Sequence, residues 1–208
     1  MIEYYNRRRI IQTPTPPLPT SLIHHFPLDS VSGLNDIKGS GILSPYQNRI
    51  AWNNTDNHYL FTFLGGNASY TGRAADLSNL ILGQINGQPL DNLSICLTLI
   101  VKSYTSNWGL EPFRFANQQM LMGMGTAMAP WYFPVNTQLK YVLVFDKGQR
   151  YDYFNGVLIN STSGNNSPSN NITTAIFGGA SSGSAGTAYL WNLQIHNKSL
   201  TQQEVQLY

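Results

Sequence analysis

The segment Tyr141 to Asn160, YVLVFDKGQRYDYFNGVLIN, constrains the fold more than any other part of the chain. Tyr141 to Phe145 is an unbroken apolar and aromatic run, which is typical of a strand covered on both faces. A short polar turn with a glycine leads to a second strand at Tyr151 to Phe154. Asn155-Gly156 follows, and this pair favours a type I′ hairpin turn because both central residues need a positive φ. The segment therefore predicts three antiparallel strands in a meander.

The rest of the chain also has the pattern of short strands. In Leu93 to Lys102, the residues Leu93, Ile95, Leu97, Leu99 and Val101 share one face of a predicted strand, which indicates that one face lies in a core. No amphipathic helix of three or more turns is predicted. The clearest helix signal is a capping box from Thr201 to Glu204. Many short strands separated by turn residues predict an all-β, two-sheet antiparallel jelly-roll sandwich with a short C-terminal helical turn. Cys96 is the single cysteine, so it forms no intrachain disulfide and is expected in the core.

Residues 1–20 differ from the rest of the sequence. Tyr4, Tyr5 and Arg7-Arg8-Arg9 precede a proline-rich run at 13–19, which favours an extended polyproline II conformation. One interpretation is an untethered tail with a stiff spacer. The other is a docking arm, with the tyrosines as anchors and the arginines facing an acidic surface on other protein subunits. The predicted division is an arm at 1–20 and a globular domain at 21–208.

The composition excludes several classes of function. Charged residues make up 11% of the chain and the net charge is +2, which is too small to indicate nucleic-acid binding. No apolar run is long enough for a membrane span. The N-terminus has no apolar segment behind its positive charges, so no Sec signal peptide is predicted. A weakly charged surface rich in Asn, Ser and Thr suits a virion or an extracellular surface.

Several motifs, in a particular order, resemble one family of domains. These are Phe26-Pro27-Leu28-Asp29 before a Gly/Asp loop, Phe63-Leu64-Gly65-Gly66, the strand Ser94 to Lys102, Tyr153-Phe154-Asn155-Gly156 after a run ending in Asp146, Ile176-Phe177-Gly178-Gly179, and the closing segments Leu190 to Ile195 and Leu200 to Tyr208. Over residues 21–208, this order resembles laminin-G-like, concanavalin A-like lectin and glucanase domains. The resemblance implies a jelly roll in which one sheet often presents a concave face. The group includes lectins, adhesive modules, viral and phage surface proteins and glycosidases, so the fold alone does not select a function.

The acidic residues argue against catalysis. A retaining glycosidase needs two carboxylates about 5 Å apart, and on one strand these would be two or four positions apart on the same face. No two of the ten acids have either spacing. The four histidines show no metal-ligand spacing. Calcium is the one metal considered, because Asp29 and Asp36 bracket a loop rich in oxygen ligands. The alternative is a solvated turn in which aspartate makes local hydrogen bonds. No other cofactor is predicted.

Aromatic residues beside polar loops are candidates for sugar binding, because a pyranose stacks on an aromatic face and bonds to planar polar groups. The candidates are Trp52, Tyr70, Trp108 and Trp131. Each could instead serve core or loop packing, since large aromatics carry much of the buried area in a sandwich.

Three functions are thus considered. The first is a non-catalytic structural or adhesive module, a surface or decoration protein of a virion or phage that is anchored by its N-terminal arm and binds a cell-surface glycan. The second is a carbohydrate-binding lectin domain that acts as a free or secreted protein. The third is a glycoside hydrolase.

Overall fold

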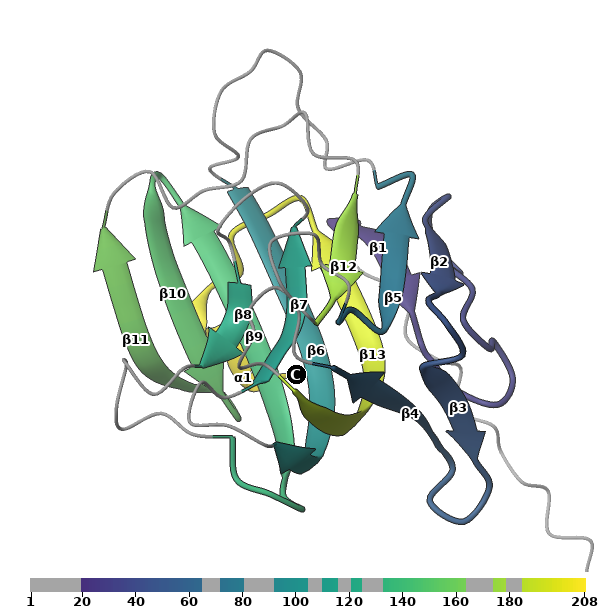
Figure 1. The fold of residues 1–208 in the computed structure, drawn as a ribbon. Helices are drawn as coiled ribbons and strands as arrows, with labels where there is room; N and C mark the ends of the chain where they lie inside the picture. The colour runs from purple at the N-terminus through teal and green to yellow at the C-terminus, as the bar shows by residue number, and fades with distance from the viewer. Residues whose placement is uncertain are drawn as a thin grey trace, which may run out of the picture.

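The computed structural model describes residues 20–64, 72–80, 92–104, 110–115, 121–124, 133–163, 174–178 and 185–208. These residues form two antiparallel sheets packed face to face, so the predicted all-β sandwich is confirmed (Figure 1). None of the described helices is long and apolar enough to cross a membrane. Except for Thr20, the predicted N-terminal arm lies outside the described residues.

The larger sheet has eight strands in the order β11-β10-β9-β6-β13-β4-β3, with β1 paired to β13. Its strands are β1 (Leu22–Phe26), β3 (Ile50–Asn53), β4 (His58–Phe63), β6 (Asn92–Tyr104), β9 (Gln138–Asp146), β10 (Gln149–Phe154), β11 (Val157–Ser163) and β13 (Gly186–His196). The smaller sheet has five strands in the order β2-β5-β12-β7-β8. They are β2 (Ile42–Pro45), β5 (Ala75–Ser78), β7 (Leu110–Phe115), β8 (Leu121–Met124) and β12 (Ala175–Phe177).

The predicted meander is confirmed as β9, β10 and β11. Asn155 and Gly156 have φ values of 48° and 79°, as a type I′ turn requires. Lys147 and Gly148 also have positive φ, so the preceding turn has the same left-handed backbone. The segment Ala74 to Leu82, for which the sequence favours neither a helical turn nor a loop, contains strand β5.

The main core lies between the two sheets, on what we call the inner face of the larger sheet. It includes all five alternating residues predicted on β6 and Leu139, Tyr141, Leu143 and Phe145 of β9. In β13, Ala188, Leu190, Leu193 and Ile195 belong to this core. Alternation along β13 predicts that Tyr189 and Trp191 share the face of Leu193 and Ile195. Tyr189 instead lies on the face opposite Ala188 and Leu190, because a bulge between Trp191 and Gln194, with Asn192 at φ 53°, shifts the register.

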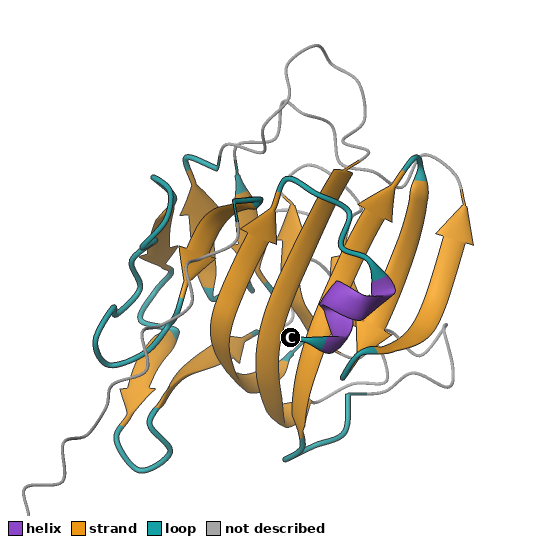
Figure 2. Ribbon diagram, turned by 180° about the vertical axis from the view of Figure 1, so that it is seen from behind, coloured by secondary structure: helices purple, strands orange, loops and turns teal. Residues whose placement is uncertain are grey.

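A smaller apolar cluster lies on the outer face of the larger sheet. Helix α1 (Gln202–Gln206) packs there, and Leu200 and Val205 cover Cys96, Val142 and Val144 (Figure 2). The predicted capping box of Thr201 and Glu204 is present. The Cys96 thiol is free and buried as expected, and burial raises its pKa well above the usual range.

Candidate functional site

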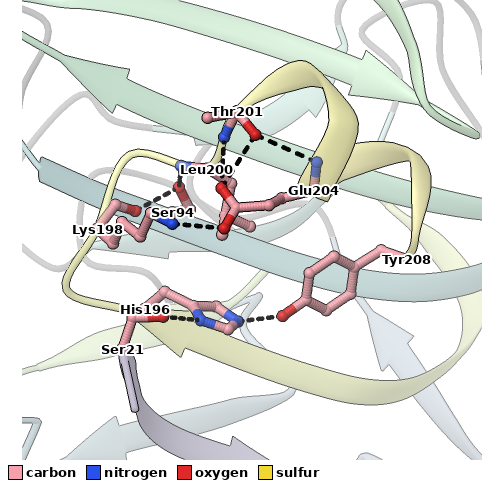
Figure 3. A network of polar contacts seen from close by, with 8 residues as sticks. All are labelled: Ser21, Ser94, His196, Lys198, Leu200, Thr201, Glu204 and Tyr208. Atoms are coloured by element: carbon pink, nitrogen blue, oxygen red, sulfur yellow. Dashed lines mark hydrogen bonds and ion pairs between the residues drawn. The ribbon is translucent and has the colours of Figure 1, made fainter. Parts of the chain in front are cut away.

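Part of the outer face is closed by the segment that carries α1. Ser94 Oγ donates a hydrogen bond to the Lys198 carbonyl at 2.7 Å and accepts one from the Leu200 amide at 2.9 Å (Figure 3). His196 lies between the hydroxyl groups of Tyr208 and Ser21. Burial lowers the pKa of His196 to about 4, so the ring is neutral at physiological pH. These contacts fasten the C-terminal segment to the outer face of the sheet.

The inner face of the larger sheet changes from apolar to polar between β9 and β10. Arg150 and Asp152 pair with Phe145 and Leu143 of β9, so they share the face of the core. On β11, Thr162 and Asn160 lie opposite Arg150 and Asp152. Figure 1 shows β10 and β11 extending past β8, the outermost described strand of the smaller sheet. We call the surface formed by Arg150, Asp152, Phe154, Asn160 and Thr162 the β10–β11 inner face.

Asp152 is the centre of this surface. Its carboxylate accepts hydrogen bonds from Tyr141 Oη at 2.5 Å, Arg150 Nε at 3.0 Å and Arg150 Nη2 at 2.8 Å. Asn160 Nδ2 donates a further bond at 3.2 Å. The Asp152 side chain is 1% exposed and that of Arg150 is 17% exposed, so the guanidinium group extends from a buried carboxylate toward the surface.

Burial and neighbouring charges hold Tyr141 and Arg150 each in one protonation state. Burial, followed by the charge of Asp152, raises the pKa of Tyr141 well above its usual value, so the phenol remains a donor. Burial by itself would lower the pKa of Arg150, but Tyr141 and Asp152 raise it overall. Arg150 therefore stays positively charged, and a carboxylate held in a buried bidentate pair fixes its orientation.

An aromatic ring borders the polar group. Phe154 is half-buried, and its ring lies 5.0 Å from that of Tyr141 and 5.4 Å from that of Phe133. Guanidinium and amide donors next to an aromatic ring suit a ligand with many hydroxyl groups and an apolar face. Sequence reasoning missed this site. The available signal was Asp152 in the predicted middle strand, Tyr151 to Phe154, with Arg150 two positions earlier, because an inward charge in such a strand needs a partner.

Trp52 is the only one of the four predicted sugar-binding aromatics within the described residues. It lies on β3, at the opposite end of the larger sheet from β11. Its ring is half-buried and packs edge-on against Tyr59, with the centroids 4.9 Å apart. Its Nε1 donates to Asn54 Oδ1 at 2.9 Å. The structure therefore places Trp52 away from the β10–β11 inner face, while Tyr70, Trp108 and Trp131 fall outside the described ranges.

The two aspartates predicted to bind calcium face N–H donors. Asp36 accepts backbone hydrogen bonds from His25, Lys38, Gly39 and Gly41, and its Oδ2 lies 2.6 Å from His24 Nδ1. Asp29 accepts from the Val31 and Ser32 amides. Among the residues that the structure describes, no group of three or more His, Cys, Asp or Glu could hold a metal. This geometry favours the alternative of local turn hydrogen bonds, and calcium binding stays a prediction.

No protein-family model matches the sequence, and no curated protein matches it. Solved structures match the fold. The receptor-binding domain of botulinum neurotoxin D aligns at a TM-score of 0.66 and 12% identity, covering 90% of this chain and 52% of that one. Domain 4 of AbnA, an extracellular arabinanase from Geobacillus stearothermophilus, aligns at 0.60 and 16% identity, covering 89% and 97%. Trypanosoma rangeli sialidase aligns at 0.62 and 12% identity, covering 90% and 32%.

These similarities define the class of fold, a concanavalin A-like two-sheet sandwich, as the resemblance in the sequence implies. The chain spans about half the length of the neurotoxin structures and nearly all of the arabinanase domain. At such low identity the likeness establishes the fold, while function depends on the site.

Proposed function

We propose that this chain is a non-catalytic carbohydrate-binding module whose ligand lies on the β10–β11 inner face. The observation that carries the proposal is the buried Asp152 carboxylate, which orients Arg150 and Asn160 beside Phe154. Sugar hydroxyls accept hydrogen bonds from guanidinium and amide groups, and the C–H face of a sugar ring packs on an aromatic ring. A binding site needs these groups held in place before the ligand arrives, and the Asp152 network holds them.

Two matched structures support the class of ligand. One is the arabinanase domain in complex with arabinotriose, and another is a neurotoxin D ligand-binding domain in complex with N-acetylneuraminic acid. Those ligands belong to those proteins. Their shared class, carbohydrates, agrees with the chemistry of the β10–β11 inner face.

The ion pairs that several acidic residues form support a non-catalytic role. Asp152 is paired with Arg150, Asp76 with Arg73, and Glu204 with Lys198. A glycosidase needs one carboxyl group as a proton donor and a second as a nucleophile or base. Groups engaged in ion pairs and a helix cap are poorly suited to these tasks, so a glycoside hydrolase is the least favoured interpretation.

A glycan array tests the proposal. The wild-type chain and an Asn160→Ala/Thr162→Val variant would be compared, with Ser161→Ala as the matched control, because Ser161 is the neighbouring β11 residue between the two. We expect the double variant to lose about tenfold or more in affinity, since each hydrogen bond to a sugar is worth about 1 kcal/mol. The control should bind as the wild type does. Absence of binding to every glycan, with and without Ca²⁺, would contradict the proposal.

Trp52→Ala in the same array tests the site predicted from the sequence. A loss with Trp52→Ala and none with the β10–β11 variant would move the ligand to the β3 end of the sheet.

Anchoring to a larger assembly, on a virion or another extracellular surface, remains a separate prediction. It depends on Tyr4, Tyr5 and Arg7–Arg9, which lie outside the described residues. Deletion of residues 1–20 should abolish co-sedimentation with the source particle if the arm is the anchor.

A further inference from the structure

Tyr141 lies where the inner face of the larger sheet changes from apolar to polar. Its cross-strand neighbours are Leu97 of β6, which belongs to the main core, and Phe154 of β10, which borders the proposed site. The Tyr141 side chain is fully buried, yet it ends in a hydroxyl group. A buried hydroxyl costs free energy unless it makes a hydrogen bond, so the direction of this group is set by its partners.

The Tyr141 hydroxyl contacts both members of the ion pair. It donates to Asp152 Oδ1 at 2.5 Å, and the same carboxylate oxygen accepts from Arg150 Nη2 at 2.8 Å. The phenol oxygen also interacts with the guanidinium group of Arg150. A tyrosine hydroxyl can donate one hydrogen bond and accept another, so the three side chains form a triangle. Because each of them bonds to the other two, rotating any one side chain breaks two bonds.

The ring of Tyr141 contacts the aromatic part of the site. Its centroid lies 5.0 Å from that of Phe154, with the ring planes at 81°, and 5.9 Å from that of Phe133. The charge distribution of aromatic rings favours such an edge-to-face contact and so holds the two rings at one relative angle. Phe154 also packs on Phe133, with the centroids 5.4 Å apart. One buried side chain thus contacts both the polar half and the aromatic half of the site.

We propose that Tyr141 is the positioning residue of the β10–β11 inner face, in which its hydroxyl sets the direction of the Arg150 guanidinium group and its ring sets the plane of Phe154. The inference rests on the proposed function, since the groups that Tyr141 positions are those proposed to touch the sugar. Tyr141 itself is 0% exposed, so it acts through these groups and does not contact the ligand. Tyr141→Phe should therefore disturb the polar half alone, and Tyr141→Leu should disturb both halves.

NMR spectroscopy of the full chain tests the two tasks without any sugar. The Arg150 Nε–H signal, assigned by its absence in Arg150→Lys, should exchange slowly with water in the wild type, because this group donates to Asp152 at 3.0 Å. In Tyr141→Phe we expect its exchange rate to rise about fivefold or more, as the loss of one hydrogen bond allows. The flipping rate of the Phe154 ring should be unchanged in Tyr141→Phe and higher in Tyr141→Leu.

Tyr153→Phe is the matched control. Tyr153 is another buried tyrosine of the same meander, but it packs in the apolar cluster on the outer face of the sheet. Loss of its hydroxyl should leave the Arg150 exchange rate and the Phe154 flipping rate as in the wild type. An unchanged Arg150 exchange rate in Tyr141→Phe would overturn the proposal, as would an equal rise in Tyr153→Phe. Both phenylalanine variants keep the buried ring, so this comparison holds even if Tyr141→Leu does not fold.

The glycan array separates this inference from the proposed function. Tyr141→Phe should bind the array glycans about fivefold more weakly than the wild type, and Tyr153→Phe should bind them equally well. If the wild type bound no glycan, the proposed function would fail, while the Arg150 exchange rate would still decide whether Tyr141 positions Arg150. Wild-type affinity in Tyr141→Phe, despite faster Arg150 exchange, would overturn the positioning role, because the direction of Arg150 would then not matter to the ligand.

Discussion

Asp36 and Asp152 are both buried carboxylates, with side chains 1% exposed, but their partners differ in kind. Asp36 accepts four hydrogen bonds from backbone amides, and His24 is the one side chain shown to pair with it. Asp152 accepts its bonds from the side chains of Tyr141, Arg150 and Asn160. A carboxylate held by backbone amides shapes its own loop. One held by side chains orients groups that reach the surface, and these groups can bind a ligand.

The two carboxylates also differ in how closely the surrounding chain encloses them. A Cβ added at Gly39 would lie 2.5 Å from His24 Nδ1 and 2.8 Å from Asp36 Oδ2. The loop therefore wraps closely around Asp36, and no ligand can approach its oxygens from that side. Arg150, in contrast, leads from Asp152 to a partly exposed surface.

The largest effect is expected for Asp36→Ala. It removes the acceptor for four backbone amides and the carboxylate that pairs with the buried His24, which should lower the free energy of unfolding by about 3–5 kcal/mol. Urea denaturation measures this loss. Asp29→Ala is the control, because Asp29 is only half-buried and accepts bonds from two amides of its own turn, and it should lose about 1 kcal/mol or less. A loss below about 1 kcal/mol for Asp36→Ala would remove the contrast between the two carboxylates.

Asp152→Asn should lower the free energy of unfolding by about 2–4 kcal/mol, because the amide replaces a buried carboxylate that pairs with the largely buried Arg150 charge. The same change should weaken glycan binding, since Arg150 loses its orientation. Arg150→Met/Asp152→Leu should regain much of the stability but none of the binding, because an apolar pair can replace a buried ion pair. If this variant recovered both stability and glycan binding, the Arg150–Asp152 ion pair would have only a structural role.

A third buried group, His196, should make the free energy of unfolding depend on pH in mild acid. Burial lowers its pKa to about 4, even though Glu204 raises it, while His25 and Lys198 lower it further. The unfolded chain, with a pKa near 6.5, binds a proton that the folded chain does not, so stability should fall as the pH drops from about 6.5 to 4, by on the order of 2 kcal/mol. His196→Gln should remove this slope in urea denaturation measured across that range, and an unchanged slope would assign it to another group.

Below that range Asp36 should dominate. His24 and the backbone amides hold its pKa well below the usual value, although burial by itself would raise it. Its contribution is complete above the unfolded pKa of about 3.9 and is lost as the pH falls further. Asp36→Asn should therefore flatten the loss of stability below about pH 4.

The smallest effect is expected for Glu204→Gln, which gives an exposed reference for the two buried carboxylates. Lys198 and the Thr201 amide lower the pKa of Glu204 to about 2. The ion pair is exposed and screened by solvent, so the loss should stay below about 1 kcal/mol. High salt should reduce the difference from the wild type, and a salt-independent loss above 1 kcal/mol would show that the capping box, not the ion pair, fastens α1.

Features set by neighbouring residues were predictable from the sequence. The Asn155-Gly156 turn, the alternation of β6 and the Thr201 cap all depend on contacts within a few positions, and the structure contains all three. The bulge at Asn192 was not predictable, because one extra residue in a strand changes the alternating pattern of apolar and polar residues very little.

The sequence by itself therefore determined the fold class, because alternation and turn chemistry act locally and a sandwich is what many such strands form. Only the tertiary structure decided which polar side chains from distant parts of the chain meet. The proposed site at Arg150 and Asp152 depends on β10 and β11 extending past the described edge of the smaller sheet. Arg49 and Arg73 meet at Tyr46 because the chain crosses between sheets and returns 24 residues later. Both depend on which strands become neighbours, and that is set by packing of the whole chain.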